Sequence, residues 1–213
     1  MKERRIHALK TTAAILAILF LAACSSEPTK SGVSDKPAAK PTELATGREA
    51  FQKLYATARM SAADARPIRL ESQAIKDAMG VDGKAAVWRT QFASASRRSM
   101  KAYVWSGASS SDAPDRGISH GSEETWVSTN VSTQPFEMAF IKIDSDAAYE
   151  VSQKHGGDKA LKKDATLPVL YILDWDASKN VLVWRVIYGS SRDDAKLIVD
   201  VDATKGEFIR VER

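Results

Sequence analysis

Hydrophobic side chains recur at helical spacing directly after residue 46. Thr46 and Glu49 form a capping box, in which each side chain accepts a hydrogen bond from a backbone N–H at the start of a helix. Phe51, Leu54 and Tyr55 follow on one face, so the pattern predicts a helix over 47–60. A second helix is expected after Asp144-Ser145, with Ala147, Ala148 and Val151 on one side, an end at Gly156-Gly157, and a short turn at 159–163.

Short β-branched or aromatic runs, separated by turn residues, predict strands after each helix. The second half holds four such runs at hairpin spacing, which predict an antiparallel meander. The first half holds three, followed by a Ser- and Gly-rich stretch at 106–121 that is expected to be a flexible loop before a fourth strand. The predicted strands are 68–74, 86–92, 100–105 and 124–128, then 167–175, 181–188, 196–202 and 207–211.

The two halves also share a local sequence. Val87-Trp88-Arg89 and Val183-Trp184-Arg185 align without gaps at an offset of 96 residues, and both runs continue through a polar turn into another alternating run. This predicts a duplicated unit. The fold class expected is α+β, with one helix packed across one antiparallel sheet in each of two tandem units, 46–135 and 136–213.

The N-terminal residues have the pattern of an export signal. A basic stretch at 1–10 precedes the uncharged apolar run 11–23, which is shorter than the ~20 residues of a membrane span. The run ends in Leu21-Ala22-Ala23-Cys24, which resembles the lipobox of bacterial lipoproteins. The resemblance implies a signal peptide 1–23, cleavage between Ala23 and Cys24, and acylation of the Cys24 thiol. The alternative is a buried cysteine in an uncleaved helix.

A Pro-, Ser- and Lys-rich segment follows at 24–45 and predicts a flexible linker that cannot bury a core. In Gram-negative lipoproteins an Asp after the acylated Cys tends to retain the protein at the inner membrane. The residue here is Ser25. The resemblance therefore implies an envelope protein anchored in the outer membrane and facing the periplasm.

The charge distribution and the cysteine content limit the partners and the cross-links that are possible for this chain. The chain has 31 Lys plus Arg against 27 Asp plus Glu, but residues 1–23 hold four of the basic residues and one acidic residue. The remainder is almost neutral, which argues against a nucleic-acid partner. A composition of 44% hydrophobic and 27% charged residues is that of a globular domain. A single cysteine excludes an intramolecular disulfide.

The closing hairpin of the second half resembles that of PepSY and PepSY-like domains. The residues are Val201-Asp202-Ala203-Thr204-Lys205-Gly206-Glu207, after the upstream strand Val183-Trp184-Arg185-Val186. Lys205 is an insertion relative to the family pattern, and the first half lacks the hairpin. The resemblance implies tandem cystatin-like units without universal catalytic residues. It also implies an extracytoplasmic interaction module that inhibits or regulates peptidases.

Candidate chemistry is sparse. His120 lies in the predicted loop and His155 at a predicted helix end, and no metal, nucleophile or phosphate-loop motif is present, so we expect no cofactor or metal. The pairs Asp174 with Asp176 and Asp200 with Asp202 place two carboxylates on one strand face. They are either turn and solvent-face groups or a cation or acid–base site, and the first interpretation is favoured.

Aromatic residues on the predicted strands have two interpretations. Trp88, Trp105, Trp184 and Tyr188 either pack in a core or form an exposed surface that binds a partner, since Trp and Tyr are frequent anchors at interfaces. The function expected is a non-enzymatic, lipid-anchored module that binds an envelope protein or peptide. The alternatives are a structural lipoprotein of envelope assembly and a hydrolase-like enzyme with a site between the repeats.

Overall fold

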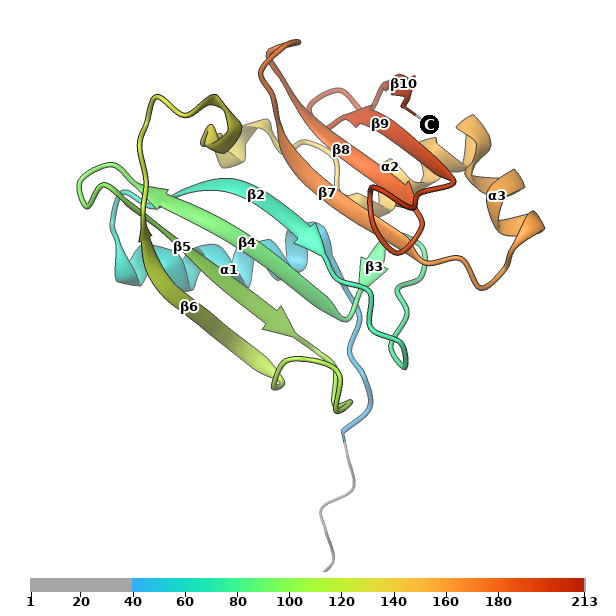
Figure 1. Ribbon diagram of the computed structural model, residues 1–213, viewed down its shortest axis with the longest axis horizontal. Coiled ribbons are helices and arrows are strands. Elements are labelled where there is room, and N and C mark those ends of the chain that lie inside the picture. The colour runs from blue at the N-terminus through green and yellow to red at the C-terminus, as the bar shows by residue number, and fades with distance from the viewer. Residues whose placement is uncertain (1–39, 213) are drawn as a thin grey trace, which may run out of the picture. The chain divides into compact units, whose positions relative to one another are not determined.

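Eight long strands form one continuous antiparallel sheet, drawn in Figure 1 with helices α1 and α2 behind it. This computed structural model describes residues 40–212. The strand order is β10-β9-β8-β7-β2-β4-β5-β6. The bounds are β2 Arg66–Ser72, β4 Val87–Ser94, β5 Ser99–Ser106, β6 Gly117–Thr125, β7 Val169–Asp176, β8 Val181–Tyr188, β9 Leu197–Asp202 and β10 Phe208–Val211.

The α+β class expected from the sequence is confirmed, but the two halves share one sheet. The strands of the first half lie on one side and those of the second half on the other, with β2 hydrogen-bonded to β7 between them. In that pair Arg69 lies opposite Asp174, and Leu70 lies opposite Leu173. Pairing β2 with β7 removes two sheet edges that separate units would have exposed.

Helix α1, Gly47–Ser61, begins at the capping box predicted for it. The Glu49 N–H donates to Thr46 Oγ1 at 3.3 Å, and the Thr46 N–H donates to Glu49 Oε2 at 2.9 Å. The buried face of α1 carries Phe51, Leu54 and Ala58, and the helix packs on β2, β4 and β5. The 3.6-residue spacing therefore predicted both the helix and the side that it buries.

The second helical region differs from the prediction. Helix α2, Ser145–Ser152, leads into a wide turn, η3 Gln153–Gly157, and then into helix α3, Asp158–Lys163, where a turn was expected. Gly156 has a φ of +116°, which interrupts the helix as the glycine pair indicated. Gly157 lies so close to Tyr188 that an added Cβ would be 2.0 Å from the Tyr188 hydroxyl oxygen, so this contact requires glycine.

Strand β6 corrects the prediction of a loop at 106–121 and a strand at 124–128. It begins at Gly117, inside the predicted loop, and ends at Thr125. Nearly every residue of β6 is exposed, so the strand lacks the alternation that would have marked it. The minor elements are β1 Ala45–Thr46, β3 Lys84–Ala85, and the 3₁₀ turns η1 Val131–Thr133 and η2 Met138–Phe140.

The N-termini of α1 and α2 meet where the halves join. The Gly47 N–H donates to Ser145 Oγ at 2.7 Å, and the Arg48 N–H donates to Asp144 Oδ1 at 2.8 Å. Ser145 Oγ in turn donates to the Gly83 carbonyl at 2.6 Å. Residues from the start of the second half thus satisfy backbone donors at the first turn of α1, which ties the halves together.

The two sheet faces have different roles. Side chains that alternate onto the helix-covered face form the main core, which includes Trp88, Trp184, Tyr171 and Leu173 together with residues of α1. The intervening side chains of the same strands lie on the opposite face, called here the open face.

Within residues 40–212, no helix is long and apolar enough to cross a membrane.

Candidate binding hollow on the open face of the sheet

Charged side chains from five adjacent strands form a row across the open face. The row consists of Arg69 on β2, Asp174 on β7, Arg185 on β8, Asp200 on β9 and Arg210 on β10. The strand order places these elements side by side, and the register puts Arg185 opposite Asp200 and Arg210 opposite Asp200. Positive and negative charges therefore alternate along the hydrogen-bonding direction of the sheet.

Ion pairs link neighbours in this charged row. Arg69 Nη2 lies 2.8 Å from Asp174 Oδ2, and Arg185 also bonds the Asp174 carboxylate. Arg185 Nε lies 3.7 Å from Asp200 Oδ1, and Arg210 Nη2 lies 3.0 Å from Asp200 Oδ2. The row thus has more guanidinium groups than carboxylates.

Glu212 extends the charged row past the end of β10. Its carboxylate bonds Arg210, and its Oε2 atom lies 2.7 Å from Arg192 Nη2 in the turn between β8 and β9. Burial alone would raise the pKa of Glu212, but the hydrogen bond from Arg210 and the charges of Arg192 and Arg185 outweigh it, and the pKa is lowered. Glu212 therefore remains an ionised partner of these arginines.

The centre of the charged row is buried and incompletely bonded. The Arg185 and Asp200 side chains are 7% and 1% exposed. Arg185 Nε, Arg210 Nε and both carboxylate oxygens of Asp200 make no hydrogen bond of good geometry, although the ion pairs above lie within reach. Unsatisfied buried groups of this kind are costly. Burial raises the pKa of Asp200 to about 6, even though Arg185 and Arg210 oppose the shift.

A hollow of about 380 Å³ opens over the charged row. Its far wall is the segment around η1, which contributes Val131, Ser132 and Gln134. Trp126 fixes this segment over the sheet, because its indole N–H donates to Thr133 and its ring packs with Ile68 in a small apolar cluster. The charged lining of the hollow is Arg69, Arg185, Arg192, Arg210, Asp174, Asp176 and Glu212.

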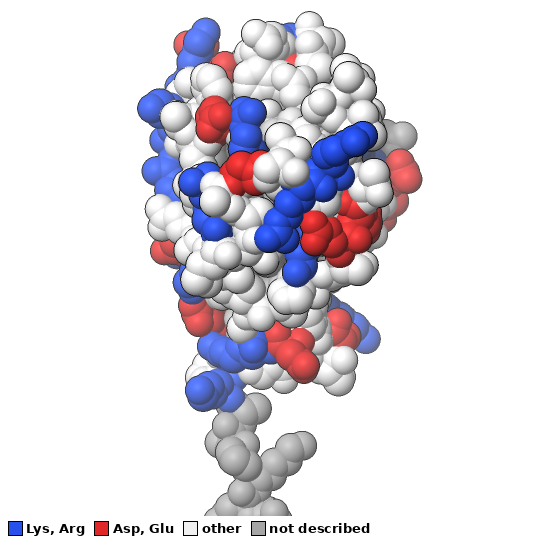
Figure 2. All heavy atoms as spheres, turned by 90° about the vertical axis from the view of Figure 1, so that its left-hand side faces the viewer, with Lys and Arg blue, Asp and Glu red and all other residues white. Residues whose placement is uncertain are grey.

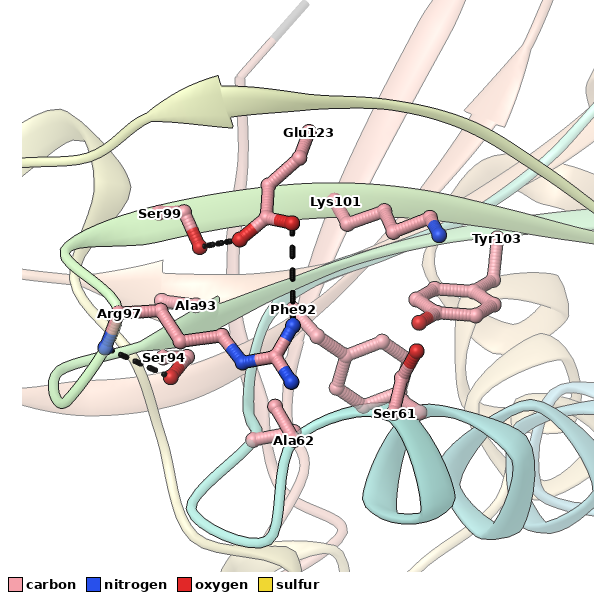
Figure 3. Close-up of a pocket in the computed structure, with 12 residues that line it drawn as sticks. Ser61, Ala62, Phe92, Ala93, Ser94, Arg97, Ser99, Lys101, Tyr103 and Glu123 are labelled. Carbon is pink, nitrogen blue, oxygen red and sulfur yellow. Dashed lines mark hydrogen bonds and ion pairs between the residues drawn. The ribbon is translucent and has the colours of Figure 1, made fainter.

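A second pocket lies at the C-terminal end of α1 and is much smaller, about 20 Å³. Figure 3 shows Arg97 extending from the β4–β5 turn toward Glu123 of β6, with Ser61 at the end of α1 nearby; Arg97 Nη1 lies 3.8 Å from Glu123 Oε2. A volume of this size holds about one water molecule. Figure 2 views the molecule from this side, where basic and acidic side chains are interspersed.

The aromatic residues predicted to bind a partner are instead buried. Trp88, Trp184 and Tyr188 are 0% exposed, and Trp105 is 4% exposed beneath Lys53, whose Nζ lies 4.7 Å from the indole centroid. All four lie on the helix-covered side of the sheet, in the main core. The prediction of an exposed aromatic surface on these residues is therefore wrong, and the alternative of a core role is confirmed.

The histidines do not share a site. His120 lies on edge strand β6, with its ring 5.8 Å from that of Tyr103. His155 stacks on Phe208 of the opposite edge strand, β10, with a centroid distance of 3.7 Å. Neighbouring strands are ~4.8 Å apart, so the two edges are roughly 30 Å apart. The two imidazoles therefore do not come together at a site between the halves.

The paired aspartates have two different roles. Asp176 and Asp202 cap turns, as predicted: Asp202 Oδ1 accepts from the Thr204 N–H at 2.7 Å. Asp174 and Asp200 belong instead to the charged row, where Asp174 is 9% exposed and lines the hollow and Asp200 is fully buried. Among the described residues, no group of three or more His, Cys, Asp or Glu side chains is arranged to hold a metal ion. Ala23 and Cys24 lie outside those residues.

Comparison of the sequence with protein-family models and with curated proteins gives no match. Among solved structures, the chain is similar to the crystal structure of a protein of Clostridium difficile 630 described as a "putative lipoprotein". The TM-score is 0.50 at 13% sequence identity, over 76% of this chain and 91% of that chain. At this identity the likeness is one of fold.

Proposed function

We propose that this chain is a lipid-anchored envelope protein whose folded part is a non-enzymatic module that binds a protein or peptide partner in the hollow. The anchor is the lipobox Leu21-Ala22-Ala23-Cys24, with acyl chains on Cys24. Each buried methylene of an acyl chain contributes ~0.8 kcal/mol, so two or three chains hold a protein stably on a bilayer. The fold shared with the clostridial protein is consistent with this proposal.

The linker 24–45 then acts as a tether between the membrane and the sheet. Ser25 after the acylated cysteine favours the outer membrane, with the folded unit in the periplasm.

The tandem PepSY-like organisation belongs to the same proposal. The shared order of elements supports it, because each half places a helix before its main strands. A role in inhibiting or regulating an envelope peptidase would follow from that resemblance.

The observation that carries the binding proposal is a hollow floored by buried charge. Arg185 lines the hollow although its side chain is only 7% exposed, and its ion pairs are with Asp174 and Asp200. Taking two charges out of water is costly, so a buried ion pair is weak evidence of a role in stability alone. A buried guanidinium facing an open space of about 380 Å³ is better explained as a group that meets a ligand.

Photocrosslinking in living cells tests the proposal. Ser132 is exposed and lines the hollow, so a photoreactive amino acid in its place would report a partner bound there. Lys163 at the end of α3 is also exposed but is not part of the lining, and it provides the matched control. We expect a discrete crosslinked product from position 132 in the membrane fraction and none from position 163. Equal products from both positions, or none from position 132, would contradict the proposal.

A further inference from the structure

We propose that the hollow binds a carboxylate group of the partner, held by the guanidinium groups of the charged row. This inference rests on the proposed function, because it specifies the chemistry of the same site. The chemical basis is the donor set: each guanidinium offers five N–H donors in a planar fork that matches the two oxygens of a carboxylate. Arg69, Arg185, Arg192 and Arg210 all line one hollow.

The charge of the lining favours an anion. Four arginines stand against Asp174, Asp176 and Glu212, so the lining carries one excess positive charge. Asp176 is further engaged with the β7–β8 turn, where its carboxylate accepts from the Ser178 hydroxyl at 2.6 Å. The four guanidinium groups offer more N–H donors than their ion pairs use, so an incoming carboxylate can accept hydrogen bonds from the remaining donors.

The size of the hollow limits what can enter. A space of about 380 Å³ accommodates a side chain or a chain end but not a folded domain. Val131 on the wall is 72% exposed, so an apolar surface lies beside the charged floor. A peptide segment could thus place a carboxylate among the arginines and a neighbouring apolar group against Val131. The carboxylate is either a chain terminus or an Asp or Glu side chain.

Asp200 couples this binding to a proton. It lies beneath the hollow and faces Arg185 on β8, Arg210 on β10 and Glu212 after β10, and Arg210 also lies 3.6 Å from Asp176. When Asp200 is ionised, the lining and Asp200 together are neutral, and a ligand carboxylate would add an uncompensated negative charge. Protonation of Asp200 restores the balance. Carboxylate binding is therefore expected to take up one proton and to weaken above pH 6.

Calorimetric titration of the full chain in detergent at pH 5.5 and 7.5 tests the inference. The probes are acetyl-Glu-amide, which has only a side-chain carboxylate, and acetyl-Gly-Gly, which has only a terminal one. Acetyl-Gln-amide is the matched uncharged control, and inorganic phosphate is the competing anion. For the better carboxylate probe we expect the dissociation constant to rise by up to about 25-fold between the two pH values, the limit reached when only the form with protonated Asp200, of pKa about 6, binds the probe.

Two variants separate ligand binding from a structural role. Asp200→Asn should bind the carboxylate probe more tightly than the wild type at pH 7.5 and lose most of the pH dependence. Arg192→Gln, at an exposed position, should weaken binding several-fold without loss of the fold. If neither carboxylate probe exceeds acetyl-Gln-amide, if phosphate binds better, or if Asp200→Asn binds more weakly at pH 7.5, the inference is wrong.

The two experiments distinguish the two levels of the proposal. A partner crosslinked from position 132 together with no carboxylate binding would leave the proposed function intact and overturn this inference. Carboxylate binding without any crosslinked partner would support the carboxylate chemistry of the hollow and overturn the proposed binding of a protein or peptide partner.

Discussion

Asp200→Asn provides a quantitative test of the charged row through folding stability. The substitution keeps the shape of the side chain and removes its charge. In the wild type, burial raises the pKa of Asp200 from 3.8 to about 6. Between these two values the folded protein binds more protons at this site than the unfolded chain does. The stability contributed by Asp200 is therefore present at low pH and is lost as the pH rises through 6.

The magnitude follows from the two pKa values. Between pH 5 and pH 8, the wild type should lose about 1.4 kcal/mol of unfolding free energy through this one group. The Asn variant cannot lose it. Other carboxylates titrate in both proteins. The quantity to follow is therefore the difference in unfolding free energy between the wild type and the variant, compared at the two pH values. This difference should shift toward the variant by about 1.4 kcal/mol.

Urea unfolding at pH 5 and pH 8, followed by tryptophan fluorescence, measures this shift. A fragment beginning at residue 39 contains the whole compact unit and suits the assay. Asp176→Asn is the control, because hydrogen bonds from Ser178 lower the pKa of Asp176 and its stabilising effect is already complete at pH 5. A stability difference for Asp200→Asn that is constant from pH 5 to pH 8, or that grows in favour of the wild type, would refute the reasoning.

Three further predictions concern the junction, the core and the anchor. Ser145→Ala should cost about 2–4 kcal/mol of unfolding free energy, because it leaves the Gly47 N–H and the Gly83 carbonyl buried without partners; a loss under about 0.5 kcal/mol in urea unfolding would be inconsistent with this. Tyr188→Phe should lower the unfolding free energy by about 1–2 kcal/mol, because the Tyr188 hydroxyl forms hydrogen bonds with Ser152 and Gln153, each at 2.6 Å. An unchanged urea midpoint would contradict this prediction. Cys24→Ser should abolish metabolic labelling with a fatty-acid analogue and release the protein from membranes, whereas retention of label would disprove the anchor.

Local patterns predicted the elements that carry their own periodicity. The capping box and apolar spacing placed α1 to within one residue of its end, and the β-branched and aromatic run 181–188 matches β8. Strand β6 escaped prediction because it is an exposed edge strand, and its Gly-Ile-Ser-His-Gly-Ser sequence shows no buried face. Periodicity reports burial, so an element without a buried side gives little signal.

The charged hollow could not be predicted because it depends on strand order. Arg69 and Asp174 are 105 residues apart and meet only when β2 pairs with β7. A local signal did exist, since Arg185 sits in the middle of an otherwise apolar strand, where a charge requires a partner. The tryptophans were ambiguous for a related reason: their burial was decided by which sheet face the helices cover.

Hydrogen–deuterium exchange of the full chain, with and without the partner recovered from position 132, tests the central claim most directly. Binding in the hollow should slow exchange at residues 131–134 and in the β7–β8 and β8–β9 turns, which contribute Ser178 and Arg192 to the lining. Exchange in β6 and α3, away from the hollow, should not change. Protection confined to β6 or α3, with none around the hollow, would contradict the assignment of the open sheet face as the binding site.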